Sequence, residues 1–207
     1  MNREETIAGI LHKLKAVKIN VKEPFTFSSG IKSPIYCDNR IILGYPEERE
    51  KIVDGFLQII NSEEADVIAG VATAGISWAA FIADRLKKPM AYVRNKPKEH
   101  GAGNQIEGAE VRGKKVMVIE DLISTGGSSI NAVEVLLKEG AVKTEVKAIF
   151  SYNFSEAGEN FSKLNCKWDT ISNFDVLIEL LKKEKYLNAK EAEIALKWNK
   201  DPKNWVY

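Results

Sequence analysis

The sequence contains little cysteine and little histidine, and this scarcity excludes several kinds of site. Two cysteines and two histidines occur among 207 residues. Cys37 and Cys166 are too far apart to give the short ligand spacing of a structural zinc site. We interpret them as two free, partly buried thiols rather than as a disulfide.

Long apolar runs and an excess of charge of one sign are also absent. No stretch approaches the ~20 apolar residues that a membrane-spanning helix needs, and the charged start of the chain is unlike a secretory signal. The 30 basic and 29 acidic residues give a net charge of +1, so no global field attracts nucleic acid or an anionic membrane. We therefore expect a cytoplasmic protein without nucleic-acid or membrane partners, in which a local site holds any phosphate ligand.

The central part of the chain alternates short apolar segments with amphipathic ones. The predicted strands are 66–70, 90–93, 115–120 and 142–150, and the predicted helices are 46–60, 76–86 and 128–138. Strands that alternate with helices indicate crossover connections. The sequence therefore predicts an α/β fold with a central, mostly parallel sheet flanked by helices on both faces.

The segments on either side of this core have a different composition. Residues 19–42 are rich in Ser, Gly, Pro and aromatics and predict a small β-rich appendage after a helix at 3–16. Two amphipathic helices are predicted near 173–184 and 189–199. We expect a single domain over 1–207 with three parts: an N-terminal hood (1–42), a core (about 43–170) and a C-terminal helical segment (171–207).

A polar segment interrupts the alternation between the second and third predicted strands. Residues 94–104 carry several cations, one proline and two glycines, and no large apolar side chain that would anchor them to a core. Long polar loops inside compact domains are usually functional or disordered. We therefore predict a functional loop here, mobile without ligand and ordered when its ligand is bound.

Residues 116–128 give the strongest indication of chemistry. An apolar strand is followed by Glu120 and Asp121, and then by a loop of hydroxyls and glycines that begins the next helix. Ligands bind at the carboxyl ends of parallel strands, and such a loop lets the backbone and the helix N-terminus bind a phosphate. The two carboxylates would repel a bare phosphate, so the pattern favours a ligand that also carries sugar hydroxyls or a cation. An ordinary strand-to-helix turn with a capping hydroxyl leaves the adjacent acids unexplained.

This segment resembles the phosphoribosyl pyrophosphate (PRPP) signature of the type I phosphoribosyltransferase family. Two more segments are similar to the orotate-specific branch of that family. One is Ser29-Gly30-x-x-Ser33-Pro34 in the hood, and the other is Lys98-x-His100-Gly101 in the polar loop. Together with Gly70–Gly75, a loop expected to face the pyrophosphate, the resemblance extends over essentially the whole chain.

The resemblance implies transfer of the 5-phosphoribosyl group from PRPP to orotate, a step of pyrimidine biosynthesis. It implies catalytic roles for Lys98, His100 and Asp121. The residues expected to bind PRPP are Arg94, Lys98, His100, Glu120, Asp121, Leu122, Ile123, Ser124, Thr125, Gly126, Gly127 and Ser128. The residues expected to bind orotate are Lys32, Tyr36, Arg40 and Ser124. The resemblance also implies Mg²⁺ that is bound through the substrate rather than by protein alone, and a homodimer in which the loop serves the neighbouring subunit.

The sequence departs from the family pattern at several positions. Ser28, Ala74 and Asn95 stand where many members carry lysine, and the arginine that many members carry near Asn153 is missing. Lys32 and Arg40 are the candidate replacements for these cations.

Two alternative functions remain open. A purine phosphoribosyltransferase is disfavoured by the hood motif and the Lys-x-His-Gly loop. A non-enzymatic regulator that senses PRPP and binds nucleic acid is disfavoured by the net charge of +1 and by a chain filled by one domain.

Overall fold

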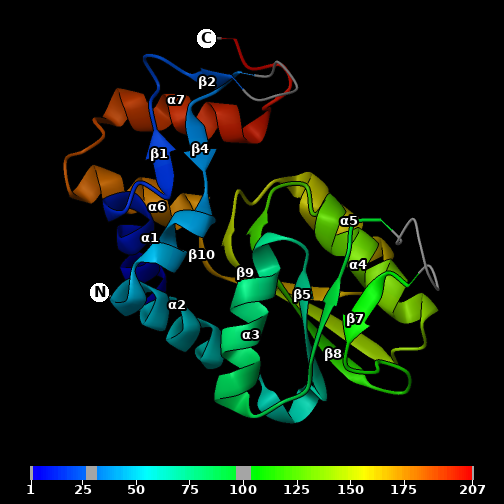
Figure 1. Ribbon diagram of the computed structural model, residues 1–207. Coiled ribbons are helices and arrows are strands. Elements are labelled where there is room, and N and C mark those ends of the chain that lie inside the picture. The colour runs from blue at the N-terminus through cyan, green and yellow to red at the C-terminus, as the bar shows by residue number, and fades with distance from the viewer. Residues whose placement is uncertain (1, 27–31, 97–103, 207) are drawn as a thin grey trace.

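The computed structural model describes residues 2–26, 32–96 and 104–206 (Figure 1). Its centre is a six-stranded sheet made of β5 (Val67–Val71), β6 (Met90–Val93), β7 (Ile106–Gly108), β8 (Lys115–Ile123), β9 (Lys143–Ser151) and β10 (Lys167–Asn173). The strand order is β10-β9-β8-β5-β6-β7. Neighbouring strands are parallel except for β7, which pairs antiparallel with β6 at the edge. The predicted fold class is confirmed.

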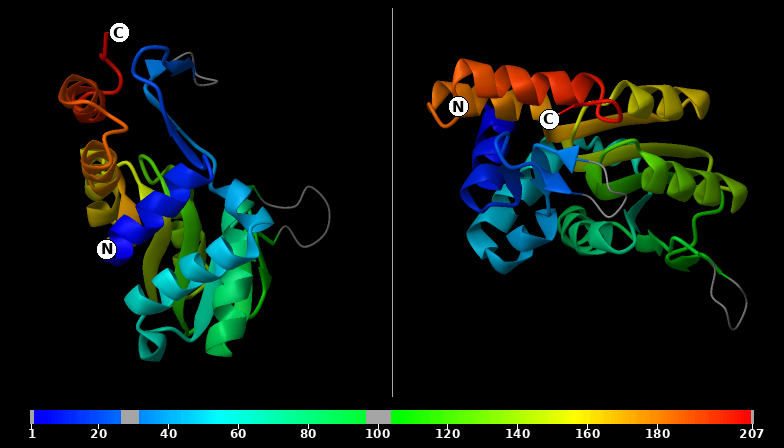
Figure 2. Two further views of the ribbon diagram at one scale, coloured as in Figure 1. Left: turned by 90° about the vertical axis from the view of Figure 1, so that its left-hand side faces the viewer. Right: turned by 90° about the horizontal axis from the view of Figure 1, so that it is seen from above.

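Helices cover both faces of this sheet (Figure 2). One face carries α1 (Arg3–Lys13), α2 (Pro46–Ile59) and α3 (Ala74–Leu86), and the other carries α4 (Gly127–Lys138) and α5 (Ser155–Lys163). A short 3-10 helix, η2 (Ser62–Glu64), connects α2 to β5. Successive side chains of a strand point to opposite faces, and in this sheet both sets are apolar. The result is two apolar clusters with the sheet between them, as a parallel sheet covered on both faces requires.

The hood contributes two small antiparallel pairs of strands. β1 (Val17–Ile19) pairs with β4 (Ile35–Cys37), and β2 (Phe25–Thr26) pairs with β3 (Lys32–Ser33). A 3-10 helix, η1 (Asn39–Gly44), then leads the chain from β4 back to the core. The hood strands therefore lie above the carboxyl edge of the sheet (Figure 1).

The C-terminal helices α6 (Phe174–Lys183) and α7 (Ala189–Lys200) pack beside the hood strands (Figure 1). Trp198 of α7 is buried, and its ring contacts the rings of Tyr152 and Phe154, which follow β9. Trp205 packs against the large apolar cluster on the same side of the sheet, so both tryptophans at the end of the chain pack on the domain. None of the helices in the described ranges is long and apolar enough to cross a membrane.

The structure corrects several sequence-based boundaries. β8 runs to Ile123 rather than to residue 120, because β9 continues to pair with it as far as Ile123↔Ser151. Among the strands of the central sheet and the helices that cover it, β7, α5 and β10 were not predicted. Helix α1 ends at Lys13 instead of residue 16, and the chain then turns through Lys15 at φ 57°. Both cysteines are free thiols, as predicted.

Candidate active site

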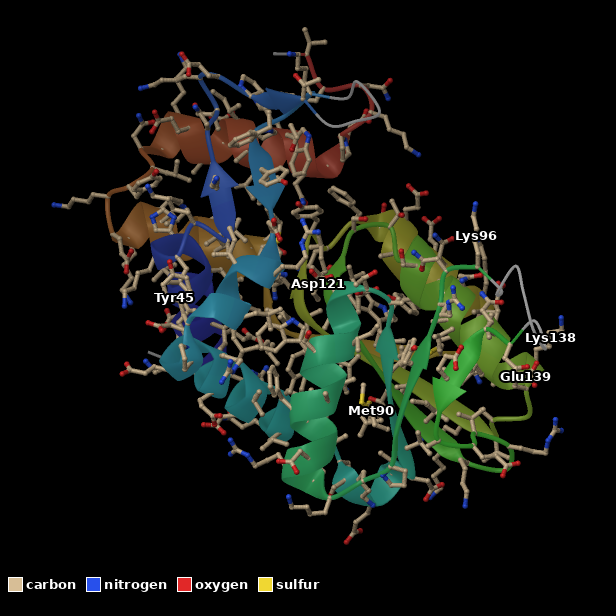
Figure 3. The ribbon with its side chains drawn as sticks, viewed as in Figure 1. Tyr45, Met90, Lys96, Asp121, Lys138 and Glu139 are labelled. Carbon is tan, nitrogen blue, oxygen red and sulfur yellow. The ribbon has the colours of Figure 1, made fainter. Side chains whose placement is uncertain are left out.

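Glu120 and Asp121 lie at the carboxyl edge of the sheet, in the last part of β8. Figure 3 shows Asp121 near the centre of the molecule, where the sheet meets the segment that descends from the hood. Glu120 is buried, with 5% of its surface exposed, while Asp121 is partly exposed. The backbone N–H of Asp121 donates to Glu120 Oε1 at 3.0 Å. The two acids thus form a compact pair next to each other.

The environment makes both acids harder to ionise. Burial raises the pKa of Glu120 well above its usual value, and the negative charge of Asp121 raises it further. Burial also raises the pKa of Asp121, although Arg40 opposes this effect. A buried acid pair of this kind is stabilised when a ligand supplies hydroxyl donors or positive charge.

The raised pKa of Glu120 predicts how stability depends on pH. A carboxyl whose pKa is higher in the folded protein than in the unfolded chain lowers stability as the pH rises from its unfolded value through its folded value. Replacing Glu120 with Gln removes this cost. We expect Glu120→Gln to raise the melting temperature at pH 7–8 by about 2–4 °C, the effect of about 1 kcal/mol in a chain of this size.

The measurement is thermal unfolding of both proteins between about pH 4 and pH 8, a window that starts near the unfolded pKa of glutamate. The difference between them should shrink toward pH 4 and vanish below it, as the carboxyl becomes neutral in the unfolded chain as well as in the folded protein. A variant that is less stable than the wild type at neutral pH would show that Glu120 is ionised and well solvated in the folded protein.

A small polar pocket follows the acid pair at the N-terminus of α4. Its volume is about 150 Å³. It is lined by Leu122, Ser124, Thr125, Gly126, Gly127, Ser128 and Ser129. The first N–H groups of a helix have no acceptor within the helix, and no side chain caps α4. These groups are therefore free to bind an anion.

Gly126 and α5 fix the shape of this pocket. Gly126 has φ 82°, in the left-handed region that glycine adopts without strain. A Cβ at this position would lie 3.0 Å from the ring of Phe161 in α5. Asn160, also in α5, donates its side-chain N–H to the carbonyl of Thr125 at 3.1 Å. Helix α5 thus packs against this loop through Phe161 and holds it with the hydrogen bond from Asn160.

The turn between β5 and α3 lies directly against the acid pair. A Cβ on Gly75 would come 2.3 Å from the carbonyl oxygen of Ile119, the residue before Glu120. Only glycine allows the first turn of α3 to approach β8 this closely. Ala74 begins α3, so the N-terminus of this helix lies beside the acids without the lysine that many family members carry there.

The hood residues predicted to bind the base lie at different distances from this centre. Tyr36 in β4 is 39% exposed and its ring lies 5.8 Å from that of Phe25. Arg40 donates two hydrogen bonds to Asp38, at 2.7 and 2.9 Å, and its charge acts on Asp121. Lys32 is exposed in the β2–β3 hairpin and donates to Thr26 at 2.8 Å.

The structure therefore brings Arg40 to the acid pair. It leaves Lys32 in the β2–β3 pair, where the Lys32 ammonium donates to Thr26.

Arg94 begins the polar segment next to β6. Its backbone N–H donates to the carbonyl of Gln105 at 2.9 Å, and the Gln105 side chain donates back to the Arg94 carbonyl at 2.9 Å. Its guanidinium lies 4.0 Å from Glu107. The two ends of the loop are thus tied together. Lys98 and His100 lie outside the described residues.

A larger groove of about 630 Å³ lies between β7 and α4. It contains none of the predicted site residues. It is lined mainly by polar side chains such as Arg112, Glu134 and Lys138, and Figure 3 shows Lys138 and Glu139 beside it, remote from Asp121. The chemistry of the site is therefore associated with the smaller pocket.

Sequence reasoning missed the residues that support the site from other elements. Asn39 donates to the backbone of Asp121 at 2.7 Å, and Asn160 and Phe161 support the α4 loop. Asn160 and Phe161 lie in a helix that was not predicted. For Asn39, the sequence offers no signal beyond an amide within the predicted β-rich appendage.

Comparisons with known proteins agree with this geometry. The profile of the family described as "Phosphoribosyl transferase domain" matches residues 45–178. The orotate phosphoribosyltransferase of Coxiella burnetii is 49% identical over 207 residues, which is 99% of this chain and 99% of that protein.

Solved structures give the same result. The crystal structure of orotate phosphoribosyltransferase from Aeropyrum pernix is 28% identical with a TM-score of 0.71, covering 88% of this chain and 99% of that one. The structure of UMP synthase from Leishmania donovani shares the fold with a TM-score of 0.78 at 24% identity, covering 95% of this chain and 42% of that one. The expected family, fold and enzyme class are thereby confirmed. With its acid pair, its phosphate-sized pocket and its full-length relatives, the chain belongs to the orotate phosphoribosyltransferase family.

Proposed function

We propose that this enzyme transfers the 5-phosphoribosyl group from PRPP to orotate, giving orotidine 5'-monophosphate and pyrophosphate. The observation that carries the assignment of the site is the acid pair Glu120–Asp121 next to the pocket at the N-terminus of α4. The pocket holds the 5'-phosphate through the backbone N–H groups and hydroxyls of residues 124–128. The acids accept hydrogen bonds from the two ribose hydroxyls.

The reaction breaks the bond between C1 of the ribose and the pyrophosphate oxygen and forms a bond from C1 to a ring nitrogen of orotate, whose N–H proton leaves to the pyrophosphate or to water. Positive charge develops on the ribose and negative charge on the leaving pyrophosphate. The carboxylates near the sugar stabilise the first, and Arg94, Lys98 and His100 stabilise the second. Binding both reactants at one sheet edge also supplies orientation.

Mg²⁺ fits this arrangement as part of the bound substrate. Among residues 2–26, 32–96 and 104–206, no group of three or more His, Cys, Asp or Glu side chains is placed to hold a metal. Glu120 and Asp121 are two carboxylates at the sugar position, and Mg²⁺ needs few protein ligands when phosphates supply the rest. When bound, the ion neutralises charge on the leaving pyrophosphate.

A metal dependence follows. We expect activity to disappear after exhaustive EDTA treatment and to return with Mg²⁺ alone, because the described part of the chain offers an acid pair but no cluster suited to zinc. The measurement is orotate consumption with PRPP before and after addition of Mg²⁺. Full activity in the metal-free protein would contradict the proposal.

The base lies between the hood and the acid pair. Tyr36 provides an aromatic surface at the hood, and Ser124 provides a hydroxyl at the pocket. Arg40, which is paired with Asp38, is the hood candidate whose charge acts on Asp121, and it is our first candidate for the orotate carboxylate. Lys32 is the second candidate, from the β2–β3 hairpin.

Base choice tests this function. Orotate carries a carboxylate that uracil lacks, so kcat/KM for orotate should exceed that for uracil by at least about 100-fold, the scale of a charge-assisted contact. The assay is consumption of each base with PRPP and Mg²⁺, with adenine and hypoxanthine as controls. Equal use of uracil would reject orotate as the substrate and leave the transferase class intact, whereas use of adenine or hypoxanthine would favour the purine alternative.

We further propose a cytoplasmic homodimer of one domain per chain, in which residues 94–104 of one subunit complete the site of the other. The absence of large apolar side chains in that segment supports a role over a ligand rather than in a core. The division into hood, core and C-terminal helical segment at residues 42 and 170 belongs to the same proposal.

A further inference from the structure

Asn39 connects the hood to the acid pair. It is the first residue of η1, two residues after the end of β4, and none of its surface is exposed. Its side-chain N–H donates to the backbone carbonyl of Asp121 at 2.7 Å. Its side-chain oxygen accepts a hydrogen bond from the Cys37 thiol at 3.4 Å. The amide is therefore held at both ends, in a fixed orientation.

The Cys37 thiol is suited to orient this amide. Burial raises the pKa of Cys37 well above its usual value, and the nearby charges of Asp121 and Asp38 raise it further. The thiol therefore keeps the proton that it donates. With its oxygen engaged by Cys37, the Asn39 side chain presents its N–H group to Asp121.

The carbonyl of Asp121 needs a partner because one neighbouring strand ends before it. β5 pairs with β8 only from Val67↔Val116 to Gly70↔Ile119. Beyond Ile119, β9 is the one strand in the described ranges that still pairs with β8. A buried carbonyl without a donor is unfavourable, and Asn39 supplies that donor from a segment 82 residues away in sequence.

We infer that Asn39 is a positioning residue for PRPP: its amide fixes the backbone of Asp121 so that the acid pair faces the ribose hydroxyls. The same residue follows the hood strand that carries Tyr36, so it ties the sugar side of the site to the base side. Asn39 itself touches neither substrate. This inference rests on the proposed role of Asp121 in PRPP binding.

Two variants separate positioning from simple structural support. Asn39→Ala removes the donor. Asn39→Asp keeps nearly the same shape and the oxygen that accepts from Cys37, but it loses the donor and places a negative charge beside Asp121. Ser172→Ala is a matched control, because Ser172 is also fully buried and donates to a backbone carbonyl of another element, that of Glu4 at 2.9 Å.

The experiment measures kcat and KM for PRPP and for orotate, the pH profile, and the melting temperature of each variant. We expect Asn39→Ala to lower kcat/KM for PRPP by about 10–100-fold, the scale of a misplaced catalytic group. Asn39→Asp should lose at least as much and should shift the acidic limb of the profile to higher pH, because a like charge raises the pKa of the acids. Ser172→Ala should lose melting temperature to a similar extent and keep kcat/KM within about twofold of wild type.

The inference is overturned if both Asn39 variants keep kcat/KM for PRPP within about twofold of the Ser172→Ala value. It is also overturned if both fail to fold while the control folds, since Asn39 would then be a structural residue only. Asp121→Asn, measured in parallel, distinguishes failure of the inference about Asn39 from failure of the proposed site. An inactive Asp121→Asn beside active Asn39 variants rejects only this inference, while an active Asp121→Asn rejects the proposed site itself.

Discussion

Replacing Asp121 with Asn is expected to lower kcat/KM for PRPP by about 100-fold and to leave the fold intact. The carboxylate would accept hydrogen bonds from ribose hydroxyls, and a hydrogen bond to a charged group contributes about 1.5–3 kcal/mol, or roughly 10–150-fold. Asn has nearly the same shape. The substitution also removes a partly buried carboxyl group, and burial raises the pKa of that group because its charged form is unfavourable there. The melting temperature should therefore not fall.

The distribution of the loss between kcat and KM adds information. Positive charge on the ribose is larger in the transition state than in the bound substrate, so a carboxylate near the sugar should matter more for kcat than for binding alone. A loss confined to KM would assign Asp121 to binding without a role in the chemical step.

Asp66→Asn is a suitable control for this measurement. Asp66 precedes β5 at the opposite end of the sheet, and its carboxylate accepts a hydrogen bond from the backbone N–H of Lys115 at 2.8 Å. The substitution removes one charge and keeps the shape, as at Asp121, but far from the pocket. Unchanged kcat/KM in both variants would remove the acid pair from the site.

The parts of this site that sequence predicted share one property: each is encoded within a short stretch. The acids, the hydroxyls and the glycines of 116–128 follow one another along the chain, so a strand, a turn and a helix N-terminus could be assigned from them. The helices α6 and α7 were found for the same reason, because each has its own apolar face.

The parts that sequence did not predict depend on contacts between distant segments. Strand β8 continues through Glu120 to Ile123 because β9 pairs with Glu120, Leu122 and Ile123; from sequence alone, two acids mark the end of a strand. Strand β10, with the sequence Lys167-Trp168-Asp169-Thr170, mixes polar and apolar residues. It is stabilised by parallel pairing with β9 at the sheet edge.

The positions of the two candidate cations, Lys32 and Arg40, also could not be predicted from the sequence. Lys32 and Arg40 are both in the hood and are equivalent as sequence candidates. The structure separates them, since Arg40 acts electrostatically on Asp121 while Lys32 bonds to Thr26 in the outer hairpin. Which cation approaches the site is determined by the course of the chain through η1, which ends the hood and carries Arg40 back to the sheet.

The second large effect is expected at Lys98, in the segment that the resemblance identifies as catalytic. Lys98→Ala should lower kcat more than it raises KM for orotate, because the lysine charge matters most as pyrophosphate departs. The loss should be about 2–4 kcal/mol, the scale of an oriented electrostatic contact. Lys138→Ala is the control: this lysine ends α4 on the side away from the phosphate pocket (Figure 3), and its removal should leave kcat unchanged.

Mixing two inactive variants tests whether Lys98 acts across a dimer. Lys98→Ala and Asp121→Asn are each expected to be nearly inactive as homodimers. If residues 94–104 complete the site of the neighbouring subunit, a heterodimer of the two variants contains one site with both substitutions and one site with neither. Its activity should then recover toward half of the wild-type value. If the segment instead closes over its own subunit, every site in the heterodimer carries one substitution, and verified heterodimers should stay as inactive as the parents. Recovery would therefore establish both the assembly and the shared site in one measurement, because a monomer or an unshared site cannot produce an intact centre from two defective chains.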